Sequence, residues 1–83
     1  MLTVNVKFIP KELTPGLSDG EYSIGEGSCA RDILTHCENV CGTSIPEKNL
    51  KLLCLLFNGK PVTPESAITE NGILHVCRVI TGG

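Results

Sequence analysis

Apolar and polar residues alternate at the start of the chain. Every even-numbered position from Leu2 to Phe8 is apolar, and the positions between them are polar. A period of two predicts a half-buried strand, which Pro10 ends because proline cannot donate to a ladder. A second short strand is predicted over residues 21–24, with Tyr22 and Ile24 on one side. Turn-forming Pro-Gly and Asp-Gly pairs lie between the two strands, so they form a hairpin with a long loop.

A helical period begins after this hairpin. Ser28 is the expected N-cap, and Gly42 stands where a C′ glycine takes the left-handed conformation. At about 100° per residue, the apolar side chains between them fall on one arc. The predicted buried arc is Ala30, Ile33, Leu34, Cys37, Val40 and Cys41.

The second half of the chain has the features of three further strands. Residues 43–49 are predicted to be a loop, and residues 51–57 a strand that is apolar at every position from Leu52 to Phe57. Asn58-Gly59 predicts a hairpin turn, and Pro61 makes the strand over 60–62 an edge strand. Residues 63–71 cross over, with one helical turn expected after Pro64, and the last strand spans 73–80.

The predicted order of elements is β-β-α-β-β-β. It indicates the α+β class, with a mixed sheet of four to five strands and one helix packed across one face. We expect the last strand to lie beside the first and parallel to it, as the central pair. The 83 residues form one domain over 1–83, in which residues 79–83 are expected to be a flexible C-terminal tail.

Composition and charge exclude several kinds of partner. The net charge is −2 and the seven basic residues are scattered, so nucleic acid is not an expected partner. No stretch reaches the roughly 18 apolar residues that span a membrane, and no signal peptide is recognisable, so we expect no membrane partner and a cytoplasmic location. The five cysteines are an odd number without a secretion signal, which favours reduced thiols over disulfides.

The sequence closes with Gly82 and Gly83. A tail of this kind can enter a narrow channel because glycine has no Cβ, and the carboxylate of Gly83 is then the functional group at its tip. A carboxylate is inert until it is activated, for example as an acyl-adenylate that a sulfur nucleophile attacks. The chain has no phosphate-binding loop, so the activating chemistry must come from a partner.

Three segments resemble the ThiS/MoaD-type sulfur carriers, which are the thiamine sulfur carrier and the small subunit of molybdopterin synthase. Residues 74–83 (LHVCRVITGG) resemble the last strand and tail of that family, residues 58–62 (NGKPV) its Asn-Gly turn, and residues 26–34 its entry into the helix. Two positions depart from the family pattern. Asn71-Gly72 replaces its usual Gly-Asp, and Arg78-Val79 stands where molybdopterin-type members often have prolines. The tail is therefore nearer to the thiamine type, while the cofactor pathway stays open.

The resemblance implies a ubiquitin-like β-grasp fold and a carrier rather than an enzyme. It further implies that an ATP-dependent adenylating enzyme activates Gly83 and that a sulfur donor converts it to a thiocarboxylate. A biosynthetic enzyme or a large synthase subunit is the acceptor of the sulfur that the resemblance implies. The resemblance makes Gly83 the reacting residue and Val79, Ile80, Thr81 and Gly82 the partner-binding residues. No cofactor is expected to be bound to the chain, since the partner uses the ATP.

Other functions compete with this one. The same tail suits a ubiquitin-like protein modifier joined to lysine, and the fold also suits a non-covalent interaction module. A metal or redox module is the weakest alternative, because His36 lies at the border of the arc that holds Cys37 and Cys41, and no second ligand pair is evident. No metal is therefore predicted.

Two features of the predicted sheet leave alternatives open. Cys77 is expected to face away from the helix, as a reactive thiol near the tail or as a passive surface thiol. The apolar run over 52–57 is either an exposed docking patch or a hydrophobic strand that a loop covers. The role of Cys54 is open.

Overall fold

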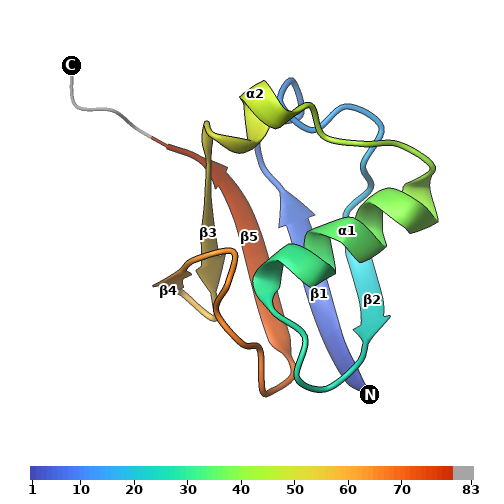
Figure 1. Ribbon diagram of the computed structural model, residues 1–83, viewed down its shortest axis with the longest axis vertical. Helices are drawn as coiled ribbons and strands as arrows, with labels where there is room; N and C mark the ends of the chain where they lie inside the picture. The colour runs from blue at the N-terminus through green and yellow to red at the C-terminus, as the bar shows by residue number, and fades with distance from the viewer. Residues whose placement is uncertain (80–83) are drawn as a thin grey trace.

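Five strands form one mixed sheet in the computed structural model, which describes residues 1–79 (Figure 1). The strands lie in the spatial order β2-β1-β5-β3-β4, and β5 runs parallel to β1 in the interior of the sheet. The predicted parallel pairing of the first and last strands is confirmed. The strands are β1 (Leu2–Phe8), β2 (Gly20–Ile24), β3 (Leu53–Phe57), β4 (Lys60–Val62) and β5 (Gly72–Arg78).

One helix, α1 (Ala30–Cys41), crosses one face of this sheet (Figure 1). The even-numbered residues of β1, with Leu74 and Val76 of β5, face it and are buried. On the helix, the buried positions recur at helical spacing, as a helix with one apolar face requires. The buried helix residues are Ala30, Ile33, Leu34 and Cys37.

The helix begins one residue later than predicted. Cys29, not Ser28, is the N-cap, and its backbone N–H donates to the carboxylate of Asp32 at 3.1 Å. Ser28 is engaged elsewhere, because its carbonyl accepts a hydrogen bond from the N–H of Ile68 at 2.8 Å. The crossover segment therefore sets the start of the helix. At the other end, Gly42 has φ of 70°, as predicted for a left-handed helix end.

Val40 does not join the core. Its side chain is 61% exposed, although the helical pattern placed it on the buried arc. Val40 lies ten residues after Ala30, which at about 100° per residue puts it about 80° away from Ala30 around the helix. The last turn of α1 presents this border of the arc to solvent, while Cys41 remains half-buried.

Two connecting segments differ from the prediction. The expected loop over 43–49 contains the start of a short helix, α2 (Glu47–Leu50), which follows Pro46 as proline commonly precedes a helical turn. Lys51 keeps a helical backbone after α2, so β3 begins only at Leu53. After Pro64 there is no helical turn; the chain makes an isolated antiparallel bridge between Cys29 and Ala67.

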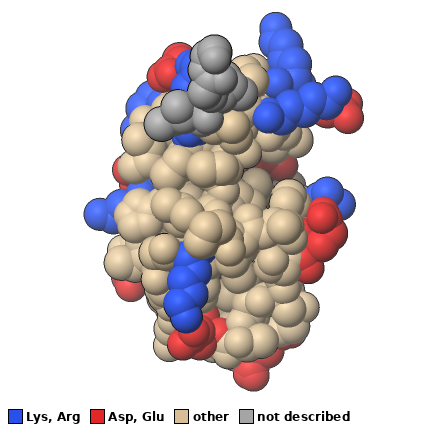
Figure 2. Space-filling model, turned by 90° about the vertical axis from the view of Figure 1, so that its left-hand side faces the viewer, with Lys and Arg blue, Asp and Glu red and all other residues tan. Residues whose placement is uncertain are grey.

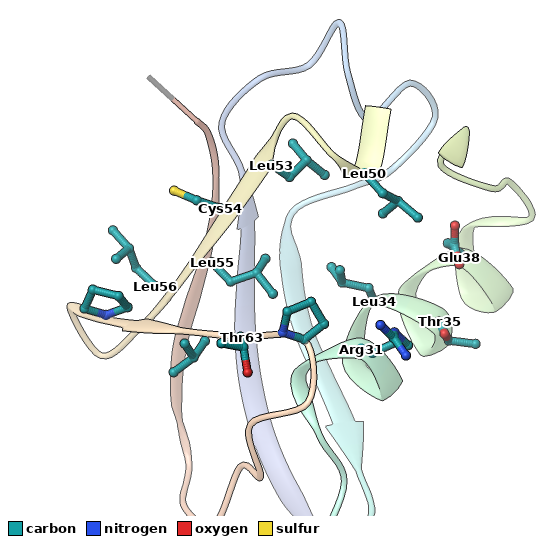
Figure 3. A pocket seen from close by; sticks show the side chains of 13 residues that line it. Arg31, Leu34, Thr35, Glu38, Leu50, Leu53, Cys54, Leu55, Leu56 and Thr63 are labelled. Atoms are coloured by element: carbon teal, nitrogen blue, oxygen red, sulfur yellow. The ribbon is translucent and has the colours of Figure 1, made fainter. Parts of the chain in front are cut away.

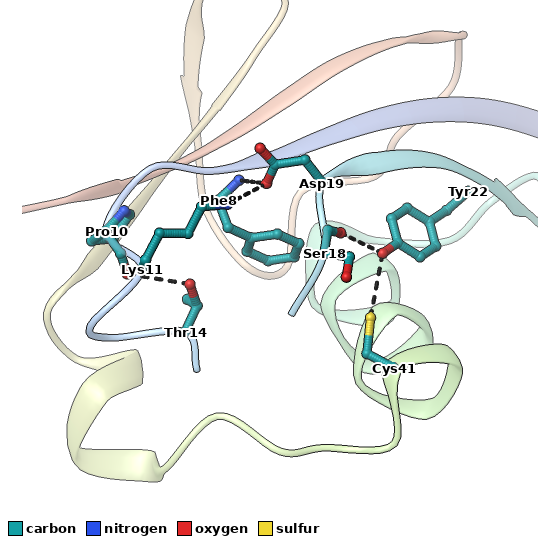
Figure 4. Close-up of polar contacts among 8 residues, drawn as sticks. All are labelled: Phe8, Pro10, Lys11, Thr14, Ser18, Asp19, Tyr22 and Cys41. Atoms are coloured by element: carbon teal, nitrogen blue, oxygen red, sulfur yellow. Dashed lines mark hydrogen bonds and ion pairs between the residues drawn. The ribbon is translucent and has the colours of Figure 1, made fainter. Parts of the chain in front are cut away.

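The long loop between β1 and β2 is held by a polar contact (Figure 4). The carboxylate of Asp19 accepts the backbone N–H of Phe8 and the ammonium of Lys11, each at 2.8 Å. The hydrogen bond from Lys11, followed by that from Phe8, lowers the pKa of Asp19 below its ordinary value of 3.8. Asp19 is the residue before β2, so these contacts join the end of β1 to the start of β2.

The hairpin between β3 and β4 has the turn that its sequence predicts. Asn58 and Gly59 both have positive φ, at 52° and 82°, which matches a two-residue turn of the type that Asn-Gly favours. The side chain of Asn58 also accepts the N–H of Ile73 at 2.9 Å, so the turn is joined to the start of β5. β4 is an edge strand, as predicted from Pro61.

Candidate functional site

The predicted functional tail follows β5 in the sequence. This strand lies between β1 and β3, and the N–H of Ile9 donates to the carbonyl of Val76 at 3.0 Å. On the other side, the N–H of Val79 donates to the carbonyl of Leu52 at 2.7 Å. Val79 was predicted as the first residue of a flexible tail, yet it is half-buried and bonded to the segment before β3.

The remaining predicted site residues lie outside the described part of the chain. They are Ile80, Thr81, Gly82 and Gly83. The last described residue is Val79, which lies beside Leu52. Arg78 at this point is exposed and pairs with Glu12 across 3.4 Å, a contact that solvent screens strongly.

The face of the sheet opposite α1 presents a second candidate surface, which we call the outer face. Its residues on β5 are Ile73, His75 and Cys77, which alternate along the strand with the buried Leu74 and Val76. The strand register places His75 opposite Leu56 and places Leu56 opposite Pro61, so an apolar row runs across β3 and β4. Figure 2 shows the side of the molecule that β3 and β4 occupy in Figure 1, where wide areas lack charged side chains.

The structure decides how the apolar run over 52–57 is used. Leu55 and Phe57 are buried toward α1, whereas Cys54 and Leu56 point the other way and are half-buried. Ile73 is 40% exposed on the neighbouring strand. The run therefore contributes side chains both to the core beneath α1 and to the outer face. Its residues on the outer face add apolar area of the kind that marks docking sites.

A groove of about 550 Å³ lies between α1 and the β3–β4 hairpin (Figure 3). The side chains of Leu34, Leu50, Leu53 and Leu55 extend toward it, and Arg31 and Glu38 border it on the helix (Figure 3). Sequence reasoning missed this groove. Leu50 belongs to the unpredicted α2, and the distance between a helix and a hairpin depends on packing that no short segment encodes.

The helix cysteines are placed as packing residues. Cys37 is fully buried, and burial raises the pKa of its thiol to about 12. The hydroxyl of Tyr22 donates to the carbonyl of Ser18 at 2.6 Å and lies 3.5 Å from the sulfur of Cys41 (Figure 4). Hydrogen bonding to Tyr22, followed by that to the backbone of Ser18, lowers the pKa of the Cys41 thiol below its ordinary value of 9.0. The two helix cysteines therefore differ, because burial keeps Cys37 protonated whereas the surroundings of Cys41 favour the thiolate.

The two sheet cysteines are brought together. Cys54 of β3 and Cys77 of β5 are direct partners in the antiparallel register, both on the outer face and both half-buried. Burial raises the pKa of the Cys77 thiol, and the neighbouring Cys54 adds to the increase. Their pairing cannot be predicted from the sequence, because 23 positions separate them and the hairpin signals do not give the β3–β5 register.

Residues 1–79 contain neither a metal-binding cluster nor a membrane-spanning helix. No group of three or more histidine, cysteine, aspartate or glutamate side chains is arranged there to hold a metal ion. None of the helices in that range has the length and apolar character needed to cross a membrane.

Several solved structures share the fold of this chain. One is described as a putative molybdopterin converting factor, subunit 1, from Pyrococcus furiosus; it has a TM-score of 0.68 and 16% identity over 96% of this chain and 100% of its own. SAMP1 from Haloferax volcanii matches with a TM-score of 0.68 and 13% identity, over 98% of this chain and 99% of its own.

A third structure is the N-terminal ubiquitin-like domain of the 4931431F19Rik protein. Its TM-score is 0.57 and its identity is 20%, over 99% of this chain and 78% of that one. No model of a known protein family matches the chain, and no curated protein matches it in sequence. The fold that the sequence resemblance implied is therefore confirmed by solved structures. The chain has the α+β, ubiquitin-like β-grasp fold.

Proposed function

We propose that this protein is a sulfur carrier that works through the carboxylate of Gly83. The observation that carries the proposal is the path of β5. This interior strand is held to its neighbours as far as Val79 and leads directly into Ile80-Thr81-Gly82-Gly83. Support comes from the fold, which the chain shares along nearly its whole length with the putative molybdopterin converting factor subunit.

The proposed chemistry takes place in three steps on a partner enzyme. A carboxylate oxygen of Gly83 attacks the α-phosphate of ATP, giving an acyl-adenylate and releasing pyrophosphate. A persulfide of the sulfur donor then attacks the acyl carbon and AMP leaves, which gives an acyl disulfide. A thiol cleaves the sulfur–sulfur bond, so that the thiocarboxylate is released and the donor's remaining sulfur forms a disulfide with that thiol. A biosynthetic enzyme or synthase subunit accepts that sulfur, in thiamine or molybdopterin synthesis. In this scheme the chain is a substrate and carrier, and its partners are the catalysts.

The length of the tail sets how the partner must approach. Four residues follow Val79, and fully extended they span at most about 13 Å. A partner that activates Gly83 must therefore bind close to the sheet, around the end of β5. We propose that Ile80, Thr81 and Gly82 line the partner's channel, that Val79 meets the partner at the edge of the sheet, and that the apolar outer face around Leu56 and Ile73 supplies docking area.

The direct test is the intact mass of the protein after incubation with ATP, an adenylating enzyme of this class and a sulfur donor. We expect one oxygen to be replaced by sulfur, a gain of about 16 Da. Oxidation of a thiol adds the same nominal mass, so the five cysteines are reduced and alkylated first. Fragmentation must place the gain on the C-terminal peptide.

A chain that lacks Gly83 is the matched control, because it keeps the fold and differs by one residue. The gain must be absent from this variant. A gain that persists without Gly83, or no gain with a cognate activating enzyme, would contradict the carrier role.

A ubiquitin-like protein modifier is the second candidate, and the likeness to a ubiquitin-like domain favours it. Here the activated Gly83 forms an isopeptide bond with a lysine. Cells that express a tagged chain would then contain a ladder of covalent conjugates that disappears when Gly83 is deleted. A thiocarboxylate without such a ladder supports the carrier. A chain that binds its partner fully without Gly83, and is never activated, would be a non-covalent interaction module.

A further inference from the structure

Two thiols face each other across the central strands of the outer face. Cys54 and Cys77 are register partners in the β3–β5 ladder, and both are half-buried. Directly opposite residues in an antiparallel pair have Cβ atoms about 4.5–5.5 Å apart. A disulfide needs a Cβ separation of about 3.5–4.5 Å. The thiols are thus close enough to be joined after a small movement of the strands.

The hydrogen-bond pattern shows which kind of pair this is. The N–H of Val79 donates to the carbonyl of Leu52, and the N–H of Asn58 donates to the carbonyl of Ile73. These two pairs continue the β3–β5 register by one step at either end of the ladder. Hydrogen-bonded and non-hydrogen-bonded pairs alternate along an antiparallel ladder. Cys54 and Cys77 are two steps from the first pair and four from the second, so they occupy a hydrogen-bonded position, where opposing side chains are farther apart. A disulfide at such a position is strained, because its two strands must move closer together, and a strained disulfide is readily reduced.

We propose that Cys54 and Cys77 form a reversible dithiol–disulfide site on the outer face, whose reactant is a low-molecular-weight disulfide. This site is separate from the carboxylate of Gly83 and does not rest on the proposed carrier function. The five thiols are free in the structure. Among them only this pair lies in direct cross-strand register within residues 1–79.

The reaction takes two thiol–disulfide exchanges. The Cys54 thiolate attacks one sulfur of the small disulfide, whose sulfur–sulfur bond breaks; a mixed disulfide forms on Cys54 and one small thiolate leaves and takes up a proton. The deprotonated Cys77 then attacks the Cys54 sulfur, the Cys54–Cys77 bond forms, and the second small thiol leaves. The protein loses two electrons and two protons, and the small disulfide is reduced to two thiols.

Burial supports this order of events. It raises the pKa of the Cys77 thiol, which lowers the fraction of thiolate at neutral pH. Cys77 is thus the poorer first nucleophile. Once Cys54 carries the mixed disulfide, Cys77 is held opposite it, and the second exchange becomes intramolecular.

The test is oxidation of the reduced full-length chain with oxidised glutathione, followed by acid quenching and mass measurement. We expect the main product to lose the mass of two hydrogens and to carry no glutathione. Trypsin leaves the two cysteines on one fragment, because it cleaves poorly before proline and Pro61 follows Lys60. A protease that cleaves after glutamate separates them, since Glu65 and Glu70 lie between Cys54 and Cys77. The disulfide must then join the fragments 48–65 and 71–83.

Two serine variants make the assignment specific. Cys77→Ser should stop at the mixed disulfide and keep one glutathione on the 48–65 fragment. Cys29→Ser, a matched control on the N-cap of α1, should lose two hydrogens as the wild type does. Circular dichroism shows that each variant is folded.

The outcomes either support or overturn the site. Joined fragments that separate again in reduced glutathione support a reversible dithiol. The proposal is wrong if the wild type accumulates stable glutathione adducts on both cysteines instead of the crosslink. It is equally wrong if the two-hydrogen loss maps to Cys37 and Cys41, whose fragments 27–38 and 39–47 are distinct.

Discussion

The two faces of β5 differ in what they do, although their residues alternate along one strand. Leu74 and Val76 are fully buried beneath α1, whereas Ile73 is 40% exposed, and His75 and Cys77 are half-buried on the outer face. The inner face provides most of the stabilising contacts. The outer face keeps apolar area and two thiols that the fold itself does not need. This difference separates the residues that hold the β-grasp fold from those that are available to a partner.

Truncation on the two faces should have the largest and most unequal effects. Leu74→Ala removes a fully buried side chain and should lower the free energy of unfolding by about 2–5 kcal/mol. Ile73→Ala, one residue away on the outer face, should cost less than about 1.5 kcal/mol because its side chain is partly in solvent. Urea denaturation of both variants measures this, and equal losses would erase the distinction between the faces.

The start of β5 tests how closely this strand packs against the hairpin turn. A Cβ at Gly72 would overlap the side-chain amide of Asn58, which holds the N–H of Ile73. Gly72→Ala should therefore cost about 1–3 kcal/mol of stability in the same urea assay. Gly25→Ala is the control, since a Cβ there meets only the Ser28 hydroxyl at 3.9 Å. Two equally mild variants would show that the Asn58 side chain moves aside freely.

A charge on the apolar row should separate stability from activation, provided that the carrier role holds. Leu56→Glu places a carboxylate beside His75 and Pro61, and it should slow formation of the thiocarboxylate about tenfold or more, which corresponds to about 1.4 kcal/mol. Thr3→Glu adds the same charge at an exposed position of the same face on β1 and should have little effect. If both variants are activated like the wild type, the outer face is not the docking surface.

The smallest effect is expected at Asp19, in the loop between β1 and β2. Because its pKa is lower in the folded chain than its ordinary value of 3.8, its contribution is complete well above pH 3.8 and is lost as the pH falls through the folded value. Asp19→Asn should reduce stability by less than about 1 kcal/mol at neutral pH, since the ion pair with Lys11 is exposed. Thermal unfolding from pH 7 to pH 2 should show the two proteins converging in acid. A constant difference would assign the effect to something other than this carboxylate.

Much of the fold follows from local patterns, and the exceptions have physical causes. The alternation in β1, the Asn-Gly turn and the glycine after α1 were sufficient to predict a strand, a hairpin and a helix end. The start of α1 was misplaced by one residue, because Ser28 is bonded to the crossover segment at Ile68 instead of capping the helix. The helix α2 was missed because four residues leave too short a period to recognise.

The candidate site divides in the same way. The glycine pair after an apolar strand and the apolar residues for two surfaces over 52–57 can be recognised from the sequence alone. The bond between Val79 and Leu52, the groove between α1 and the hairpin, and the pairing of Cys54 with Cys77 appear only in the folded chain. The two groups of features differ in range, because turns and periodicity arise from neighbouring residues, whereas the β3–β5 register depends on how the whole core packs.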